Sequence, residues 1–585
     1  MPKLTRKIRA LLLTFPLSMS AYFSHEPVSI ANSSSNRAGQ KSGLEAIERE
    51  PKKNQVLYLI QSGEIERAIG LYRQLAWEQG RYDFSLLREL GHILLLQGAK
   101  SHDDECQLIS MYGTGIAGMR QATEAYQFAF SSHNATLQLA AVQFLSQNLD
   151  DQAEEALLMA FSSPFLITRL EAAHALANRK SNRATGMIDS LMQKLPPFIQ
   201  VYFPELFAMI GSIDAIEALQ RLARNPSLEV RLAAITAAAR SGFDNFLPVI
   251  RAGATHSDYA EQETCAAALG ALNDAHSIPL LKKLAQSPNK NVALAAYYSL
   301  SQLGEHDFRK AIIESARNQN PFAIHLLSAI PTATDTLKML LHADLFDLRV
   351  NAALVLLKKR DPACVPTLLQ ILIRNEKDFG FQPLHSIGGA LLSWKVVPSC
   401  AEYAKKTNRD IPSITLMLRE QILAQALELP EEDFLILATA IFEKKQRDLI
   451  PFLVKLLENL NSAGATQLLK QQSRRVGSPF IRNYCHLALY RMKVGDPHGK
   501  ILFSWVKKQK DCPLFRFRPL LPWTERHSLA YLLTPEETSR LMIESLEALA
   551  EQHDPQGIDL ILSAIQSGHP KNRYALAGLL VKALQ

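Results

Sequence analysis

The stretch SPFLITRLEAAHAL, which runs from Ser163 to Leu176, contains the pattern that decides the fold. In its second half Arg169 is followed by alanines and a leucine at helical spacing. The same order returns as RLAAITAA from Arg231, RVNAALVL from Arg349, RNYCHLAL from Arg482 and RYALAGLL from Arg573, and without the arginine as CAAALGAL from Cys265 and ALAAYYSL from Ala293. Between 140 and 352 the copies recur with a mean step of about 30 residues, which indicates an internal repeat.

Two further marks accompany this pattern. Proline opens a leucine-rich segment behind it, at Pro248, Pro279, Pro366 and Pro451. The first turn of a helix tolerates proline, because the N–H that proline lacks would have no partner there. Ser or Asn followed by Pro precedes the pattern and predicts an N-cap and a first helical residue, at Ser163-Pro164, Asn225-Pro226, Ser287-Pro288 and Ser478-Pro479. Each unit is therefore predicted as a small-residue helix, a turn and a leucine-rich helix.

These units resemble HEAT repeats, in particular the short phycobilisome lyase HEAT-like type. The resemblance covers 133–375 well and returns around 430–490 and 540–585. It implies an all-α fold, a right-handed α-solenoid of stacked helix pairs, whose usual role is to hold other macromolecules. The segment SGEIERAIGLYRQLA, Ser62 to Ala76, is similar to the second half of a tetratricopeptide unit. We expect this N-terminal helical segment to cap the solenoid, and the recurring arginine to brace each repeat by hydrogen bonding.

The N-terminus has the layout of an export signal. Four basic residues precede an apolar stretch from Ala10 to Phe23, and small residues follow it. Cleavage would fit before Ala21 or before Asn32, and the second site would leave a net charge of +4 from the +7 of the whole chain. The sequence therefore predicts an exported, periplasmic or secreted protein, with an uncleaved anchor or a basic cytoplasmic tail as the alternative.

The predicted organisation has six parts. They are a signal-like segment at 1–31, a polar linker at 32–53, the N-terminal helical cap at 54–132, regular repeats at 133–375, degenerate repeats with a basic aromatic insertion at 376–530, and C-terminal repeats with a cap at 531–585. No segment shows a convincing period-two pattern, so we expect no strands.

Patterns typical of catalytic or cofactor sites are missing from the sequence. His-Glu occurs only at His25-Glu26, and neither H-E-x-x-H, a P-loop nor G-x-S-x-G is present. GTGIAG, Gly113 to Gly118, follows no strand, so we expect a helix-connecting loop there. His174, His325 and His486 fall in repeat helices and are expected to be packed and hydrogen-bonded, or exposed at an edge, rather than to act as ligands. The six cysteines have no C-x-x-C spacing and are expected to be buried, with a Cys485–Cys512 bridge as an alternative. We therefore predict no enzyme, no cofactor and no metal.

A basic segment interleaved with aromatic residues is the strongest indication of a binding site in the sequence. Between 474 and 529 the chain has 12 basic and three acidic residues, a net charge of +9. Such a strip can bind an acidic protein, an anionic membrane surface or nucleic acid. Its candidate partner-binding residues are Arg474, Arg475, Trp505, Lys507, Lys508, Lys510, Arg516, Arg518 and Trp523. Lys282, Lys283 and Lys358 are candidates on the repeats, where we expect the proline-initiated helices to form the inner, partner-facing side.

Taken together, the sequence predicts a non-catalytic scaffold that binds a protein partner on an extended curved surface. Nucleic acid is the less favoured partner, because export would separate the protein from it, and no small-molecule substrate is implied. The alternatives are a lyase-like repeat enzyme and a nucleic-acid-binding solenoid that uses residues 474–529.

Overall fold

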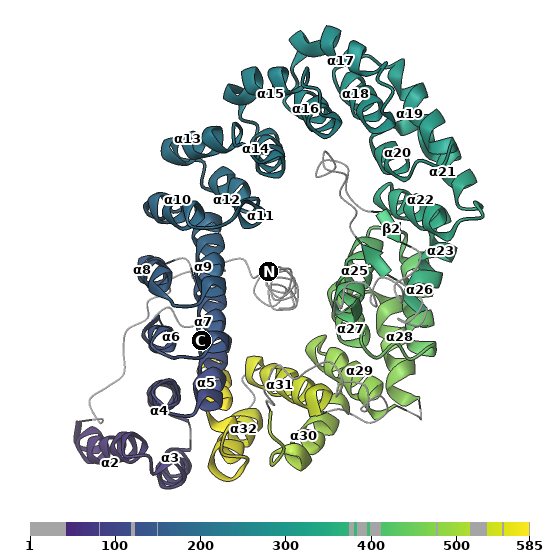
Figure 1. The fold of residues 1–585 in the computed structure, drawn as a ribbon. Coiled ribbons are helices and arrows are strands. Elements are labelled where there is room, and N and C mark those ends of the chain that lie inside the picture. The colour runs from purple at the N-terminus through teal and green to yellow at the C-terminus, as the bar shows by residue number, and fades with distance from the viewer. Residues whose placement is uncertain are drawn as a thin grey trace. The chain divides into compact units, whose positions relative to one another are not determined.

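The computed structural model describes residues 43–373, 380–382, 395–397 and 411–583, except for 81, 119–122, 149, 476–477, 515–534 and 553–554. The signal-like segment and the predicted partner-binding residues Arg516, Arg518 and Trp523 lie outside the described residues. The described chain forms two compact units (Figure 1). Unit 1 comprises residues 176–460, and unit 2 comprises 43–175 together with 461–583. No helix among the described residues is long and apolar enough to cross a membrane.

Helices from both ends of the chain build unit 2. They are α2 (Gly43–Gln61), α3 (Ile65–Gln79), α4 (Phe84–Ala99), α5 (Asp104–Ala117), α6 (Thr123–Phe130), α7 (Ala135–Gln147), α8 (Asp151–Met159), most of α9 (Leu166–Asn178), α28 (Ala463–Arg474), α29 (Pro479–Arg491), α30 (His498–Gln509), α31 (Pro535–Glu551), α32 (Pro555–Ser567) and α33 (Asn572–Lys582). Helix α2 begins inside the predicted linker at 32–53, so that boundary was wrong. Although GLEAIERE is polar, six of its eight residues are strong helix formers.

Unit 1 contains the regular repeats. Its elements are α10 (Thr185–Gln193), α11 (Pro197–Gln200), α12 (Phe203–Ile210), α13 (Ile213–Leu222), α14 (Leu228–Arg240), α15 (Leu247–Gly253), α16 (Tyr259–Ala271), α17 (Ile278–Leu284), α18 (Lys290–Gln302), α19 (Phe308–Arg317), α20 (Pro321–Leu326), α21 (Thr334–Leu340), α22 (Phe346–Lys358), α23 (Val365–Ile373), β1 (Gly380–Gln382), β2 (Lys395–Val397), α25 (Ile411–Ala426), α26 (Glu431–Glu443) and α27 (Ile450–Leu460). Strands β1 and β2 pair antiparallel, which corrects the expectation of no strands.

The predicted repeat is confirmed with a regular step. The small-residue helices α14, α16, α18 and α20 begin at residues 228, 259, 290 and 321, each 31 residues after the last. Within unit 1 they form one row with α22, and α13, α15, α17, α19 and α21 form the other (Figure 1). Stacking such pairs is an α-solenoid.

Two of the proline-initiated helices, α15 and α17, lie on the outer side of unit 1, so the expectation that they line its inner side was wrong. Figure 1 shows both outside the row of small-residue helices. Small side chains explain the arrangement, because helices on the inner side of a curved stack must approach closely. Gly270 of α16 is packed so tightly on α18 that an added Cβ would lie 2.5 Å from the Cβ of Ser299.

The Ser-Pro and Asn-Pro pairs form a turn before the helix rather than its first residues. The side-chain oxygens of Ser163, Asn225 and Ser287 each accept a hydrogen bond from the backbone N–H two residues later, at 3.1, 2.9 and 3.3 Å. These are the turns that short polar side chains favour. The helices behind them begin two residues later than predicted, and of the four predicted pairs only Ser478-Pro479 acts as N-cap and first residue.

A shared ending closes the small-residue helices of both units. Two residues after α9, α14, α16, α18, α22, α26 and α29, the backbone has a positive φ, at Lys180, Gly242, Asn273, Gly304, Arg360, Lys445 and Lys493. The next N–H donates back to the carbonyl five residues before it, for example from Asp274 to Leu269 at 3.0 Å. This is a Schellman-type ending. It turns the chain at the same point in each repeat, although only two of the seven residues are glycine.

A hydrophobic core in unit 2 is shared by the N-terminal and C-terminal helices. The buried cluster joins residues of α2 to α5 with residues of α30 to α33, including Ile69, Leu87, Ile561 and Leu576. The N-terminal segment was predicted to cap the solenoid, and the structure places it against the C-terminal helices. Ion pairs surround this junction, with Arg73 bound to Asp559 at 2.6 Å.

The junction depends on glycines that let helix backbones touch. Gly113 of α5 and Gly578 of α33 lie so close that a Cβ on either one would collide with the backbone of the other helix. Gly91 and Gly98 of α4 pack in the same way on Val581 and Tyr574, at 2.6 Å from an added Cβ. The loop expected for GTGIAG was therefore wrong, because five of its six residues belong to α5.

Adding a methyl group at this junction tests its tightness. We predict that Gly578→Ala lowers the free energy of unfolding by about 2–3 kcal/mol, because the new Cβ has no space without separating α33 from α5. Gly186→Ala is the matched control, since nothing lies within 4 Å of an added Cβ there and alanine favours the helix. Chemical denaturation measures both variants, and equal stabilities would contradict the close approach.

Candidate functional site

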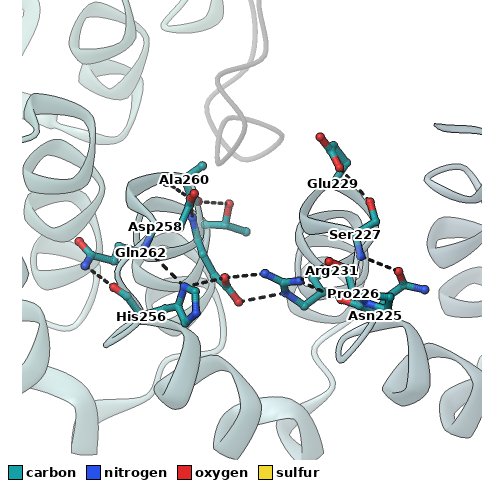
Figure 2. Close-up of polar contacts among 11 residues, drawn as sticks. Asn225, Pro226, Ser227, Glu229, Arg231, His256, Asp258, Ala260 and Gln262 are labelled. Carbon is teal, nitrogen blue, oxygen red and sulfur yellow. Dashed lines mark hydrogen bonds and ion pairs between the residues drawn. The ribbon is translucent and has the colours of Figure 1, made fainter. Parts of the chain in front are cut away.

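The recurring arginine at 231 lies in a polar network that joins two repeats (Figure 2). Arg231 of α14 donates from Nη1 to the carbonyls of Asn225 and Pro226, at 2.9 and 3.1 Å. Its Nη2 and Nε donate to the carboxylate of Glu261 on α16, at 3.0 and 3.3 Å. His256 Nδ1 lies 3.2 Å from the same carboxylate. The hydrogen bond and charge of Glu261 raise the pKa of Arg231. The network therefore fastens one repeat to the next.

The same brace occurs at Arg349 of α22. Its Nη1 donates to the carbonyls of Ala343 and Asp344, which lie six and five residues before it, at 2.8 and 3.0 Å. The predicted structural role is therefore confirmed for Arg231 and Arg349. The recurring arginines do not all have this role, because Arg482 is exposed and the Nε of Arg169 is buried without a hydrogen-bond partner.

Removing the arginine head group tests the brace. We predict that Arg231→Gln lowers the free energy of unfolding by about 1–3 kcal/mol, because Glu261, only 6% exposed, loses its bidentate partner. The double variant Arg231→Gln/Glu261→Gln should lose less than the sum of the two single variants. Thermal denaturation of the four proteins completes the cycle, and strict additivity would show that the two side chains do not interact.

Three predicted partner-binding lysines lie in unit 1. Lys282 and Lys283 are exposed in the last turn of the outer helix α17, and Lys282 is 3.1 Å from Glu305. Lys358 is the last residue of α22, in the other row, and is also exposed. The structure does not bring the three lysines onto one helix row.

Helices α28 to α30 in unit 2 carry a large excess of cations. Residues 461–514 include ten Lys and Arg but only two acidic residues, Asp496 and Asp511. Arg491 pairs with Glu544 and Glu547, and Lys500 pairs with Asp496 at 2.7 Å. We name the other eight cations the α28–α30 basic surface. They are Lys470, Arg474, Arg475, Arg482, Lys493, Lys507, Lys508 and Lys510, of which all but Lys510 are exposed.

A buried histidine pair lies beneath part of this surface. His486 of α29 and His498 of α30 place their Nδ1 atoms 2.8 Å apart, so one ring donates a hydrogen bond to the other. Burial, the His498 ring and nearby Arg482 lower the pKa of His486 to about 4. Burial, Lys470 and Arg474 lower the pKa of His498, while Asp496 opposes the shift. Arg482 therefore acts electrostatically on His486, and Lys470 and Arg474 act on His498.

The histidine pair predicts a pH dependence of stability. Both folded pKa values lie below the unfolded value of about 6.5, so the unfolded chain binds protons first as the pH falls. The free energy of unfolding should therefore decline as the pH falls from 6.5 toward 4. The contribution of His486 alone to this decline should be about 2–3 kcal/mol. Denaturant titrations at pH 7, 6, 5 and 4 measure the loss. The variant His486→Leu/His498→Leu should decline less steeply, and an identical slope would contradict this account.

The remaining predicted residues divide between core and surface. Trp505 is half-buried and packs against the core of unit 2, so its ring is part of the fold. Lys510 donates to the hydroxyl of Ser567 at 3.3 Å. Sequence reasoning expected His486 to be packed, which is confirmed, but it missed His498 as the partner. His174 is exposed and His325 is half-buried, which agrees with the expectation that these histidines are packed or edge-exposed.

The described residues contain no group of three or more His, Cys, Asp or Glu that could hold a metal ion. Cys265, Cys364 and Cys485 are buried as predicted, whereas Cys512 is exposed and Cys106 half-buried. Cys485 and Cys512 are both free thiols, so the alternative bridge is absent from this structure. Burial raises the pKa of the Cys364 thiol to about 12, which makes that sulfur a poor nucleophile.

The family comparison agrees with the repeat architecture. A family model described as HEAT repeats matches residues 247–327, which include α15 to α20. The resemblance predicted from the sequence is confirmed by this match. No curated protein matches the chain.

Several solved structures are similar to the chain at low identity. The complex of CpcE and CpcF of phycocyanin lyase from a Nostoc species is 17% identical, with a TM-score of 0.24, and covers 42% of this chain and 92% of its own. The karyopherin Kap121p bound to the C-terminus of the phosphatase Cdc14p is 13% identical, with a TM-score of 0.36 over 92% of this chain and 59% of its own. UNC-45 from Drosophila melanogaster is 14% identical, with a TM-score of 0.25, and the match covers 91% of this chain and 82% of UNC-45. The chain thus spans about three fifths of the karyopherin's length.

Proposed function

We propose that this HEAT-repeat protein is a non-catalytic scaffold that binds an acidic segment of a partner protein on the α28–α30 basic surface. The observation that carries the proposal is the excess of cations on and around α28 to α30. Residues 461–514 contain ten Lys and Arg but only two acidic residues. Such a surface attracts an oppositely charged partner and speeds its association.

The position of the cations supports this surface over the lysines of unit 1. Helix α29, which carries Arg482, packs on both α28, which carries Lys470 and Arg474, and α30, which carries Lys507 and Lys508. Lys507 and Lys508 extend the surface to the end of α30, where both side chains are exposed. In unit 1, by contrast, Lys282 already has Glu305 as a partner. A partner would therefore gain more charge neutralisation at α28 to α30.

Charge reversal at matched lysine pairs tests the proposal. The ligand is a fluorescent 14-residue peptide of Glu and Ser, and its anisotropy is measured against the full chain in 50 mM salt. We predict that Lys507→Glu/Lys508→Glu weakens binding at least tenfold, because two attractive charges become repulsive. Lys282→Glu/Lys283→Glu is the control, since it also reverses two exposed lysines in the last turn of a helix.

Three results would overturn the proposal. One is a larger loss of binding with the control pair than with Lys507→Glu/Lys508→Glu. Another is tighter binding of a single-stranded oligonucleotide of equal charge, which would identify nucleic acid as the ligand. The third is capture by vesicles containing anionic lipid without any binding of the peptide. In-cell crosslinking with mass spectrometry then identifies the natural partner.

We also propose that the protein is exported, because of the basic and apolar order of residues 1–31. The natural N-terminus of the protein purified from its source tests this. Export predicts a first residue at Ala21 or Asn32. A mature chain that begins at Met1 or Pro2 would contradict cleavage.

A further inference from the structure

A pocket in unit 2 shares no lining residue with the α28–α30 basic surface. Its volume is about 940 Å³, and helices from both ends of the chain line it. Arg73, Ala76 and Trp77 come from α3, Gly80, Tyr82 and Asp83 from the following turn, and Phe84 from the start of α4. Lys53 of α2 and Pro555 and Asp559 of α32 complete the lining. The volume is large enough for several side chains of a ligand.

The charged groups of this pocket neutralise one another. Lys53 Nζ lies 2.5 Å from Asp83, and Arg73 binds Asp559 through Nη2 and Nε at 2.6 and 3.1 Å. The bond from Lys53 and the bonds from backbone N–H groups lower the pKa of Asp83, although burial opposes them. Two cations and two carboxylates therefore leave no net charge. A charged ligand would have to break one of these pairs.

The rim of the pocket exposes large apolar side chains. Trp77 is 83% exposed and Phe84 is 51% exposed. The Tyr82 hydroxyl instead donates to the carbonyl of Pro555 at 3.3 Å, which holds this ring in the wall. An exposed tryptophan beside a concave site is the kind of residue that dominates protein interfaces. The rim is thus suited to an apolar group that covers both rings.

We propose that this pocket binds an uncharged peptide segment of a partner protein, with a large apolar side chain placed between Trp77 and Phe84. Neutral lining, exposed aromatic rings and volume all fit that ligand. The site is independent of the α28–α30 basic surface and adds a second contact to the scaffold. Because α3 and α32 both line it, a bound peptide also holds together the two ends of the chain.

A random 12-residue peptide library displayed on phage is the probe. It is selected on the full chain after depletion on the variant Trp77→Ser, whose side chain is too exposed to support the fold. We predict enrichment of uncharged sequences with Leu, Phe or Trp. A synthetic peptide from this pool should lose at least tenfold in affinity with Trp77→Ser by calorimetry. It should also raise the melting temperature of the wild-type protein.

Tyr58→Ser is the matched control, because Tyr58 of α2 is 69% exposed but does not line the pocket. The affinity of the synthetic peptide for Tyr58→Ser should equal its affinity for the wild-type protein. Enrichment of acidic or basic peptides, no enrichment, or equal loss with Tyr58→Ser would each overturn the proposal. A dimer that Trp77→Ser dissociates would also overturn it, because a second copy of the chain would then be the occupant. Unchanged binding of the Glu-Ser peptide to Trp77→Ser separates this site from the basic surface.

Discussion

The backbone contact between Gly113 and Gly578 is the constraint on which unit 2 depends. Two helices can approach to this distance only where neither has a side chain, and here the two glycines come from opposite ends of the chain. Around them, Tyr574 and Val581 fill the spaces left by Gly98 and Gly91. The ion pairs of Arg73 and Arg573 then close the edge of the junction. The pocket beside Trp77 exists because this junction brings α32 against α3.

The repeats of unit 1 depend instead on interactions within each repeat and between neighbouring repeats. A polar turn precedes α14 and α18, an arginine braces α14 and α22, and a residue with a left-handed backbone ends α14, α16, α18 and α22. Alanine-rich sequences form the inner row, because that side of the curve has the least space. The core contains one more unusual group, Arg419, which is 1% exposed and donates to Asp448, Gln446 and the carbonyl of Leu372. This arginine ties α25 to its neighbours on both sides.

The sequence predicted the local features and missed the long-range ones. Spacing of Ala and Arg was enough to predict the repeat and the bracing role of Arg231 and Arg349, because their bonds to backbone carbonyls span only five or six residues. The bond from Arg231 to Glu261, 30 residues away, was not predicted. The glycines in GTGIAG indicate a loop when taken alone, since nothing nearby in the sequence shows that Gly113 packs on the backbone of Tyr574. Only His486 of the histidine pair was singled out from the sequence, because His498 lies outside the repeat pattern. Trp77 and Asp559 are far apart in the sequence, so no motif could join them into a pocket.

Zero-length carbodiimide crosslinking with mass spectrometry tests the central claim, the junction between the chain ends, most directly. Lys571 forms ion pairs with Asp103 and Glu105, and these bonds raise the pKa of its amine. The account predicts a crosslinked peptide joining Lys571 to Asp103 or Glu105 within one molecule, at a yield comparable to that of Lys282 with Glu305, which lie 3.1 Å apart. A Lys282–Glu305 link without the Lys571 link, or a Lys571 link found only between molecules of different isotopic label, would contradict it.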